Sequence, residues 1–172
     1  MPGYVIHIAI AKEYFNKHEK NLNENNLKEF ISGSIAPDFT SNKQETHYGK
    51  SPAYTNLYKF LENNNLDTIF NRGVFLHLVT DYLFYNYYLD KLYKPQIYDD
   101  YDYSNKQIIE KYKLDIPNEI KDKIFFKVGT PVNFSMELID KMIKEISNKS
   151  LEDVALEVKS KLKKWNTYKN II

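Results

Sequence analysis

The sequence contains no cysteine, and this absence excludes a disulfide scaffold, a thiolate metal site and a cysteine nucleophile. A charge excess is also missing, because 24 lysine and arginine residues balance 23 aspartate and glutamate residues. General nucleic-acid binders normally carry a basic excess, so the balance argues against that class of protein. Long apolar runs are absent too, since His77, Asp81 and Asn86 interrupt the most apolar stretch, and we expect no transmembrane segment.

The residues that are present describe an ordinary globular protein. Of the 172 residues, 42% are hydrophobic and 15% are aromatic. A chain of this length and apolar content can bury a sizeable core, which favours one compact domain over residues 1–172. The start, Met1-Pro2-Gly3, lacks the basic residues and the apolar core of a signal peptide, so the expected location is cytoplasmic.

Apolar residues recur at helical spacing along most of the chain, and no segment alternates convincingly at the period of two that strands require. Ser51-Pro52 is typical of a helix start, whereas Gly33 and Pro37 end a helix. The sequence therefore predicts an all-α fold, a single-domain helical bundle. We expect loops over about 38–50 and 94–104, and helices over about 4–17, 27–33, 52–62, 68–92 (capped by Asp67), 105–113, 117–127, 130–146 and 151–165 (capped by Ser150).

His77 and Asp81 form the most informative pair, because they lie four residues apart on the longest predicted helix. At this spacing both side chains project from one face of the helix, within the arc of its apolar residues. A carboxylate on an apolar face must be paired, coordinated to a cation or neutralised, because burying an isolated charge is costly. The alternatives to a metal site are a His–Asp hydrogen bond in the core and a helix face that is solvated.

The remaining candidates are ambiguous when each is taken singly. His7, between apolar neighbours of the first helix, is typical of a core histidine, and His47, in the polar loop, is typical of a surface residue. Asp38 follows a proline, where aspartate usually belongs to a turn. His18 lies between two charged residues and is expected to be solvated.

As a group, three imidazoles and two carboxylates form a donor set suited to Zn²⁺ or a similar divalent ion: His7, His47, His77, Asp38 and Asp81. Imidazoles supply nitrogen donors, a carboxylate adds charge and can bridge two ions, and water at an open coordination position becomes acidic. Ligands drawn from two helices and the loops between them are a normal way to build a site inside a helical bundle.

Short motifs follow one another in the first half of the chain: His7, Gly33-Ser34-Ile35-Ala36-Pro37-Asp38, Thr46-His47-Tyr48-Gly49 and Gly73-Val74-Phe75-Leu76-His77-Leu78-Val79-Thr80-Asp81. In this order they resemble the bacterial zinc-dependent phospholipase C family, which is related to the S1/P1-type nucleases. The resemblance implies an all-α bundle that uses a cluster of metal ions to cleave phosphate esters. Beyond about residue 90 only general helicity matches, and the C-terminal helices are expected to complete the bundle.

The resemblance also implies roles for the five candidate residues. Four of them would surround one zinc ion: Asp38, His47, His77 and Asp81. Asp81 would bridge to a second zinc ion that also binds His7. The family's counterpart of Asp38 is in addition a candidate general base for the attacking water, which makes Asp38 the expected catalytic residue.

Two departures from the family limit the number of ions. The family's third metal ion needs two further histidines and a glutamate downstream, and no histidine follows His77 in this sequence. The secreted enzymes also use a mature N-terminal tryptophan as a ligand, whereas this chain begins Met1-Pro2-Gly3. We therefore expect one or two zinc ions as the cofactor, and no third.

Cations that would bind a phosphate group are less well defined than the metal ligands. Arg72 precedes His77 by five residues, so it points away from the metal face of the helix and is expected to have a surface role. Lys43, Lys50 and Lys127 are equally available for contact with phosphate.

Three functional hypotheses follow. The first is a zinc-dependent phosphoesterase, in which a metal-bound water attacks a phosphate mono- or diester of a small molecule or a lipid head group. The second is a non-catalytic helical metal-binding protein with a degenerate phospholipase C-like site. The third, nucleic-acid binding, is not expected, because it depends on lysines that are more typical of a solvated helix face: Lys159, Lys161, Lys163, Lys164 and Lys169.

Overall fold

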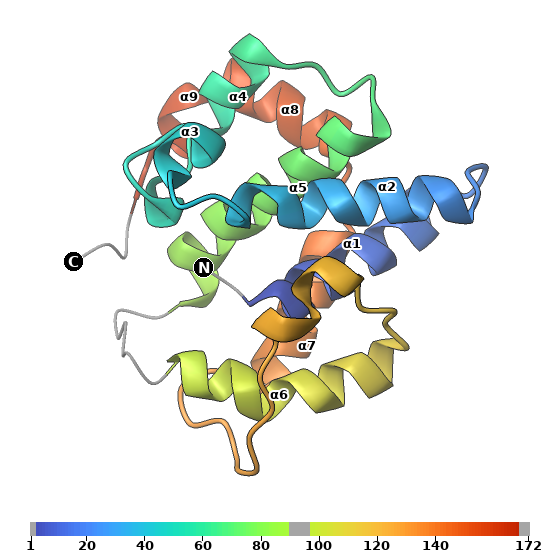
Figure 1. Cartoon of the computed structure of the whole chain (residues 1–172). Helices are drawn as coiled ribbons and strands as arrows, with labels where there is room; N and C mark the ends of the chain where they lie inside the picture. The colour runs from blue at the N-terminus through green and yellow to red at the C-terminus, as the bar shows by residue number, and fades with distance from the viewer. Residues whose placement is uncertain (1–2, 90–96, 169–172) are drawn as a thin grey trace.

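A computed structural model describes residues 3–89 and 97–168, and every regular element in these ranges is a helix (Figure 1). The α-helices are α1 (Tyr4–His18), α2 (Glu24–Ile35), α3 (Lys43–His47), α4 (Leu57–Asn63), α5 (Ile69–Leu83), α6 (Ile97–Tyr112), α7 (Met136–Ser147), α8 (Leu151–Ser160) and α9 (Leu162–Trp165). Between them lie the 3-10 turns η1 (Ala36–Asp38), η2 (Pro52–Tyr54) and η4 (Asn118–Lys123), and the π-helical turn η3 (Phe84–Tyr88). The described residues contain no strand, so the predicted all-α class is confirmed.

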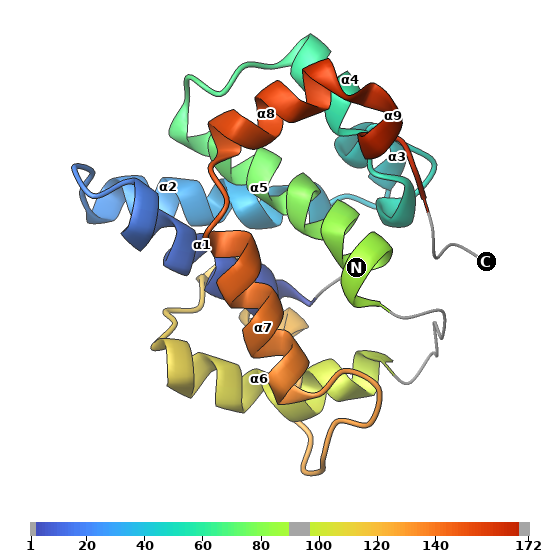
Figure 2. The ribbon, with the colours of Figure 1, turned by 180° about the vertical axis from the view of Figure 1, so that it is seen from behind.

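Helix α5 lies at the centre of the molecule, and α2 crosses it (Figure 1). Helices α3, α4, α8 and α9 gather at one end, whereas α6 and α7 lie at the other. The view from behind shows α7 packed against α1, and α8 and α4 beside each other (Figure 2). One hydrophobic core runs through these contacts, from Val5 in α1 to Trp165 in α9. Among the helices of the described residues, none combines the length and the apolar character needed to cross a membrane.

Two glycines let α2 and α5 approach closely. A Cβ atom on Gly33 would lie 2.2 Å from the carbonyl oxygen of Phe70, and one on Gly73 would lie 2.2 Å from the carbonyl oxygen of Phe30. These distances are far inside van der Waals contact, and the clashing atoms are backbone atoms that cannot rotate away. The crossing therefore requires glycine on both helices, and it brings the end of α2 against the middle of α5.

The segment 94–104 is predicted to be a loop, and this prediction is wrong for its described part. Residues 97–104 form the first half of α6, while 94–96 lie outside the described residues. The acidic composition of this segment suggests a solvated loop, but the Asp100 carboxylate is buried. It accepts hydrogen bonds from three backbone N–H groups, those of Val132, Asn133 and Phe134. Three donors offset the cost of burying this charge.

Several helix boundaries differ from the prediction because polar side chains cap the helices elsewhere. Helix α4 begins after its cap Asn56 instead of at residue 52, and α7 begins after its cap Ser135 instead of at residue 130. Thr68 caps α5 in place of the predicted Asp67. Ser150 caps α8 as predicted. Each cap accepts a hydrogen bond from a backbone N–H that has no partner inside the helix.

Further segments differ in helix type or extent. Helix α2 runs over Glu24–Ile35, so it begins before the predicted 27–33 and continues through Gly33. The predicted loop 38–50 contains α3, and the predicted helix 117–127 shortens to the 3-10 turn η4, after which Ile124 has extended backbone. The last predicted helix divides into α8 and α9 at Lys161, whose φ of −128° and ψ of 54° are not helical. The helix predicted over 68–92 continues as a π-helical turn after Leu83, and 90–92 lie outside the described residues.

Candidate metal centre

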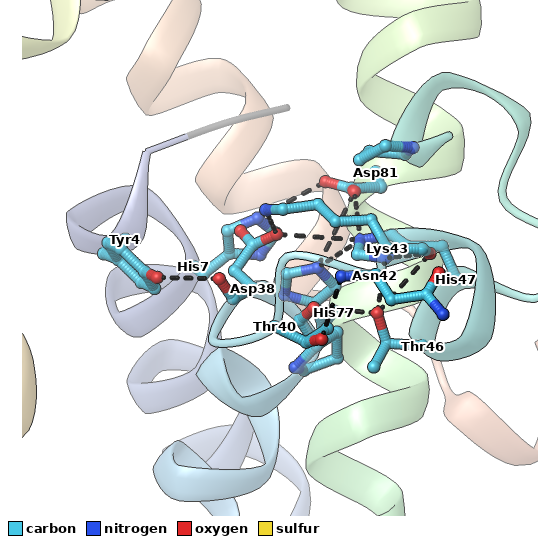
Figure 3. A network of polar contacts seen from close by, with 12 residues as sticks. Tyr4, His7, Asp38, Thr40, Asn42, Lys43, Thr46, His47, His77 and Asp81 are labelled. Carbon is cyan, nitrogen blue, oxygen red and sulfur yellow. Dashed lines mark hydrogen bonds and ion pairs between the residues drawn. The ribbon is translucent and has the colours of Figure 1, made fainter. Parts of the chain in front are cut away.

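The five predicted ligands lie together in the interior (Figure 3). They come from four elements that are far apart in the sequence: His7 from α1, Asp38 from η1, His47 from α3, and His77 and Asp81 from α5. All five are buried, with exposed fractions between 0% and 7%. The expectation that His77 and Asp81 share one buried face is confirmed, and so is the gathering of the candidate ligands around them.

Asp81 lies at the centre of the cluster. Its Oδ2 atom is 3.1 Å from Nε2 of His47 and 3.6 Å from Nε2 of His77. Its Oδ1 atom is 3.4 Å from Nε2 of His7, and the His7 ring stacks on the His77 ring with 4.0 Å between their centroids. One carboxylate therefore faces three imidazoles, as a ligand that bridges neighbouring metal positions would.

The end of α2 orients the imidazole of His77. Its Nδ1 atom lies 2.8 Å from the carbonyl oxygen of Ser34. Because a carbonyl oxygen only accepts hydrogen bonds, Nδ1 must donate, and the hydrogen of the neutral ring is therefore on Nδ1. The lone pair of Nε2 is then directed into the cluster, which is the arrangement of a metal-binding histidine held by a backbone carbonyl.

Helix α3 orients the imidazole of His47 in the same way. Its Nδ1 atom lies 3.2 Å from the carbonyl oxygen of Lys43 and 3.0 Å from the hydroxyl oxygen of Thr46. The Thr46 hydroxyl donates its own hydrogen to the carbonyl oxygen of Pro37, at 2.9 Å. Both neighbours of Nδ1 therefore act as acceptors, so Nδ1 donates and the Nε2 lone pair of His47 faces the cluster.

The cluster holds buried polar atoms that have no hydrogen-bond partner among the described residues. Nε2 of His47 and Nε2 of His77 lie only 3.2 Å apart, although each carries a lone pair in this tautomer. His7 Nε2, Asp38 Oδ2 and both carboxylate oxygens of Asp81 are buried without a hydrogen-bond partner. Buried acceptors of this kind are costly unless a positive species lies among them. The donor atoms therefore fit a divalent cation, and the nitrogen and oxygen donors match those of zinc.

The charges in the cluster shift the pKa values of its members. Burial, and then the neighbouring His77, lowers the pKa of His7 to about 4. Burial also disfavours the charged form of His77, but the Asp81 carboxylate outweighs it and raises the pKa of His77 above 6.5. Burial would raise the pKa of Asp81, yet the surrounding imidazoles hold it well below its usual value. Asp81 is thus an anion, and His7 is a neutral donor at pH 7.

Within the part of the chain that the structure describes, two groups of three residues bring their donor atoms within 4.8 Å of one another. One group consists of His7, His77 and Asp81, and the other of Asp38, His47 and His77. Three protein ligands are the usual complement of a catalytic zinc ion, which leaves one coordination position for water or substrate. Both groups meet this requirement, and they share His77.

Two residues at the centre were not assigned to it from the sequence. The Lys43 ammonium lies 2.5 Å from Oδ1 of Asp38, and its side chain is 25% exposed. The Tyr4 hydroxyl donates to the backbone carbonyl of Asp38 at 3.0 Å, and burial, with the Asp38 charge, raises the pKa of Tyr4 to about 12. Lys43 precedes His47 by four residues, which is the one sequence signal that could have placed it here.

The other candidate cations have partners away from the cluster. Arg72 forms ion pairs with Glu19 and Glu152, so it points away from the metal face as predicted. Lys127 pairs with Asp99 and Asp102, and Lys50 lies over the ring of Tyr54.

The residues that are expected to be solvated are exposed where the structure describes them. His18 is exposed, and its Nε2 lies 3.0 Å from the carbonyl oxygen of Ser147. Of the C-terminal lysines, Lys164 pairs with Glu157, and Lys169 lies outside the described residues. The other three are exposed: Lys159, Lys161 and Lys163.

A cavity of about 300 Å³ lies beside the centre. Asp38 lines this cavity and belongs to the ligand cluster as well, so it connects the two. Four of the eleven lining residues are aromatic, namely Tyr4, Tyr98, Tyr101 and Phe125, and the polar ones include Lys123, Asp102 and Asn105. Small-molecule sites are commonly apolar cavities of this size order with a few polar groups at one end.

A scan against protein-family models found no match, and neither did a search of curated proteins or a search of solved structures. The membership of a phospholipase C-like family, and with it the particular bundle type, thus stays a prediction from the motifs.

Proposed function

We propose that this protein is a zinc-dependent hydrolase of phosphate esters. The observation that carries the proposal is the buried cluster of acceptor atoms formed by the five predicted ligands, in which Asp81 faces three imidazoles and has no hydrogen-bond donor. A divalent cation among these atoms would offset the cost of burying them without partners, which supports the proposal.

The residues divide the chemical tasks among them. The imidazoles and Asp81 hold the ion, and the carbonyl groups of Ser34 and Lys43 keep two imidazoles in the required tautomer. Zinc bound there supplies Lewis-acid polarisation of a phosphoryl oxygen and lowers the pKa of a bound water. Asp38 lies between the ion-binding atoms and the cavity, and its Oδ2 atom has no partner, so Oδ2 accepts the proton of the attacking water.

The cavity beside Asp38 suits the remainder of the substrate. Its aromatic lining contacts an apolar or ring-bearing alcohol group, while Lys123, which lies over the Phe39 ring, adds a positive charge at the wall. A volume of about 300 Å³ admits a small molecule or a single lipid head group. Both kinds of phosphate ester are therefore candidate substrates.

The test starts from protein purified without chelator and without nickel affinity resin. We expect bound zinc and hydrolysis of some members of a panel of phosphate mono- and diesters, including lipid head-group esters, and we expect chelation to abolish turnover. Asp38→Asn should reduce turnover more than zinc content, because the amide no longer accepts a proton. Turnover that is unaffected by chelation, or by Asp38→Asn, would contradict the proposal.

A second candidate is a non-catalytic protein that holds zinc for structure. The observation in its favour is the burial of the ligands, since His47, His77 and Asp81 are 0% exposed and catalytic zinc keeps one position open. This candidate predicts zinc that resists chelation, a large loss of thermal stability in the metal-free protein, and no turnover of any ester in the panel.

A further inference from the structure

The two groups of candidate ligands share His77, so two ions could not both bind a complete group of three. Its Nδ1 atom is occupied by the hydrogen bond to the Ser34 carbonyl, so His77 has one lone pair, on Nε2. One imidazole nitrogen binds one ion. A second ion at Asp38 and His47 would take its third ligand from Oδ2 of Asp81, which lies 3.1 Å from Nε2 of His47, and it would have to share the Asp38 carboxylate with the ammonium of Lys43.

Lys43 places a positive charge beside Asp38, which is a carboxylate of the second ligand group. Lys43 lies on α3, one helical turn before His47, and its Nζ atom contacts Oδ1 of Asp38 at 2.5 Å. Oδ1 of Asp38 is also 3.8 Å from Nε2 of His47, so the ammonium reaches the same carboxylate that faces the metal ligands. The Lys43 side chain extends over the cluster toward Asp38 (Figure 3).

We infer that Lys43 supplies the second positive charge of the centre and binds the phosphoryl group, so that the site works with one metal ion and one ammonium. The inference rests on the proposed phosphoesterase function. It assigns the one-ion form of the centre and names the residue that recognises the phosphate.

The charges favour this arrangement. The two carboxylates, Asp38 and Asp81, neutralise one divalent ion and would leave the centre without attraction for an anion. The ammonium of Lys43 makes the centre positive, and its N–H donors suit phosphoryl oxygens, to which charge-assisted hydrogen bonds are strong. Its 25% exposure keeps the ammonium at the edge of the cluster, where a substrate can reach it.

One short helix, α3, both orients a metal ligand and carries the lysine that supplies the positive charge. The carbonyl oxygen of Lys43 accepts the hydrogen bond from Nδ1 of His47, while the Lys43 side chain contacts Asp38. The backbone of Lys43 thus orients a metal ligand, and its side chain provides the cation. Substituting the side chain removes the charge and leaves the backbone carbonyl in place, which separates the two contributions experimentally.

The experiment measures zinc stoichiometry and the binding of inorganic phosphate to the zinc-loaded protein, by elemental analysis and by titration calorimetry. Wild type is expected to bind one zinc ion per chain. Lys43→Met should keep that ion and weaken phosphate binding by about ten- to a hundredfold, which is the loss of one charge-assisted hydrogen bond. Lys43→Arg should retain most of the phosphate affinity, and Lys50→Met, on the exposed segment nearby, should change nothing.

The outcomes separate this inference from the proposed function. Two zinc ions per wild-type chain, or unchanged phosphate affinity in Lys43→Met, would overturn the inference even in an active hydrolase. One zinc ion with phosphate binding that depends on Lys43 supports it, and the ester panel then decides separately whether hydrolysis follows. If Lys43→Met does not fold, loss of phosphate affinity in Lys43→Gln with retained zinc supports the inference, and unchanged affinity in that variant overturns it.

Discussion

At the scale of single residues, Asp81 is the group on which the centre depends. It is fully buried, it faces three imidazoles, and both of its oxygens lack a hydrogen-bond donor among the described residues. The carbonyl of Ser34 prevents His77 from turning its N–H toward Asp81, and the surroundings of His47 act in the same way. In their neutral form the two imidazoles direct lone pairs at an anion, which favours a positive species among them, either a metal ion or a proton on Nε2 of His77.

His77→Ala is expected to remove most of the bound zinc, because both candidate ligand groups include His77. Loss of one of three protein ligands typically leaves too few donors for tight zinc binding. Elemental analysis of the purified variant checks this directly. His18→Ala is the matched control, since His18 lies on the surface near Ser147, and its zinc content should equal that of wild type. Undiminished zinc in His77→Ala would show that the ion lies elsewhere.

Zinc affinity is expected to rise with pH through the pKa of His77. That pKa is raised above 6.5 by Asp81, so below it a proton occupies Nε2 and must leave before the ion binds. His7, with a pKa of about 4, is already neutral over this range and releases none. Calorimetry in buffers of different protonation enthalpy should show about one proton released per zinc below the pKa of His77, and less above it. Affinity that falls with rising pH would contradict the assignment.

At the scale of elements, the crossing of α2 and α5 sets the geometry of the site. Gly33 and Gly73 allow the two backbones to touch, and the contact places the Ser34 carbonyl on Nδ1 of His77. The same end of α2 continues into η1, which carries Asp38. The close packing of α2 against α5 is therefore also needed to position the ligands of the cluster.

Gly73→Ala is expected to destabilise the fold by about 1–3 kcal/mol or more, because the added Cβ would meet backbone atoms of Phe30 and Ser34. The gain in helix propensity from alanine, about 1 kcal/mol, is too small to compensate. Zinc affinity should fall as well, since separating the helices moves the Ser34 carbonyl from His77. Chemical denaturation and zinc titration measure the two effects.

Gly3→Ala serves as the control for this prediction. Its Cβ would lie 3.5 Å from the ring of Tyr101, an ordinary contact distance, so stability and zinc affinity should stay close to wild type. If Gly73→Ala behaves like Gly3→Ala in both measurements, the close crossing of α2 and α5 is not a requirement of the fold or of the site.

The fold class and some of the helices can be predicted from the sequence, whereas contacts between distant segments cannot. Helical spacing and proline signals are local, so the all-α class, α1 and the shared face of His77 and Asp81 follow from the sequence alone. The prediction of a loop over 97–104 is wrong because the Asp100 carboxylate is buried and accepts hydrogen bonds from a segment more than thirty residues away. The sequence does not distinguish Lys43 from Lys50 and Lys127, because only the folded chain brings the Lys43 side chain to Asp38. Contacts between distant segments leave no periodic signal in the sequence.

At the scale of the whole molecule, Arg72 joins three helices outside the site. Its guanidinium pairs with Glu19, just after α1, and with Glu152, at the start of α8. The Arg72 side chain is 15% exposed, and Glu19 is 14% exposed, so this pair is largely removed from solvent. The only arginine of the sequence thus ties the N-terminal half, which carries the ligands, to the C-terminal helices.

Arg72→Met is expected to lower the free energy of unfolding by about 1–3 kcal/mol, because Glu19 is left in a mostly buried position without its partner. Zinc content should not change, since Arg72 does not touch the ligands. Lys28→Met is the control, because the Lys28–Glu24 pair is 71% and 78% exposed and should contribute less than about 0.5 kcal/mol. Denaturant titration of both variants tests this, and equal stability of the two would contradict the structural role of Arg72.

Location of the ion by anomalous X-ray diffraction at the zinc absorption edge tests the central claim most directly. The account predicts one strong peak per chain, within about 2.0–2.2 Å of Nε2 of His77 and beside the Asp81 carboxylate. Crystals of the zinc-soaked protein with no peak at His77, or with the zinc bound at surface residues alone, would contradict a buried metal centre and the hydrolase proposal that depends on it.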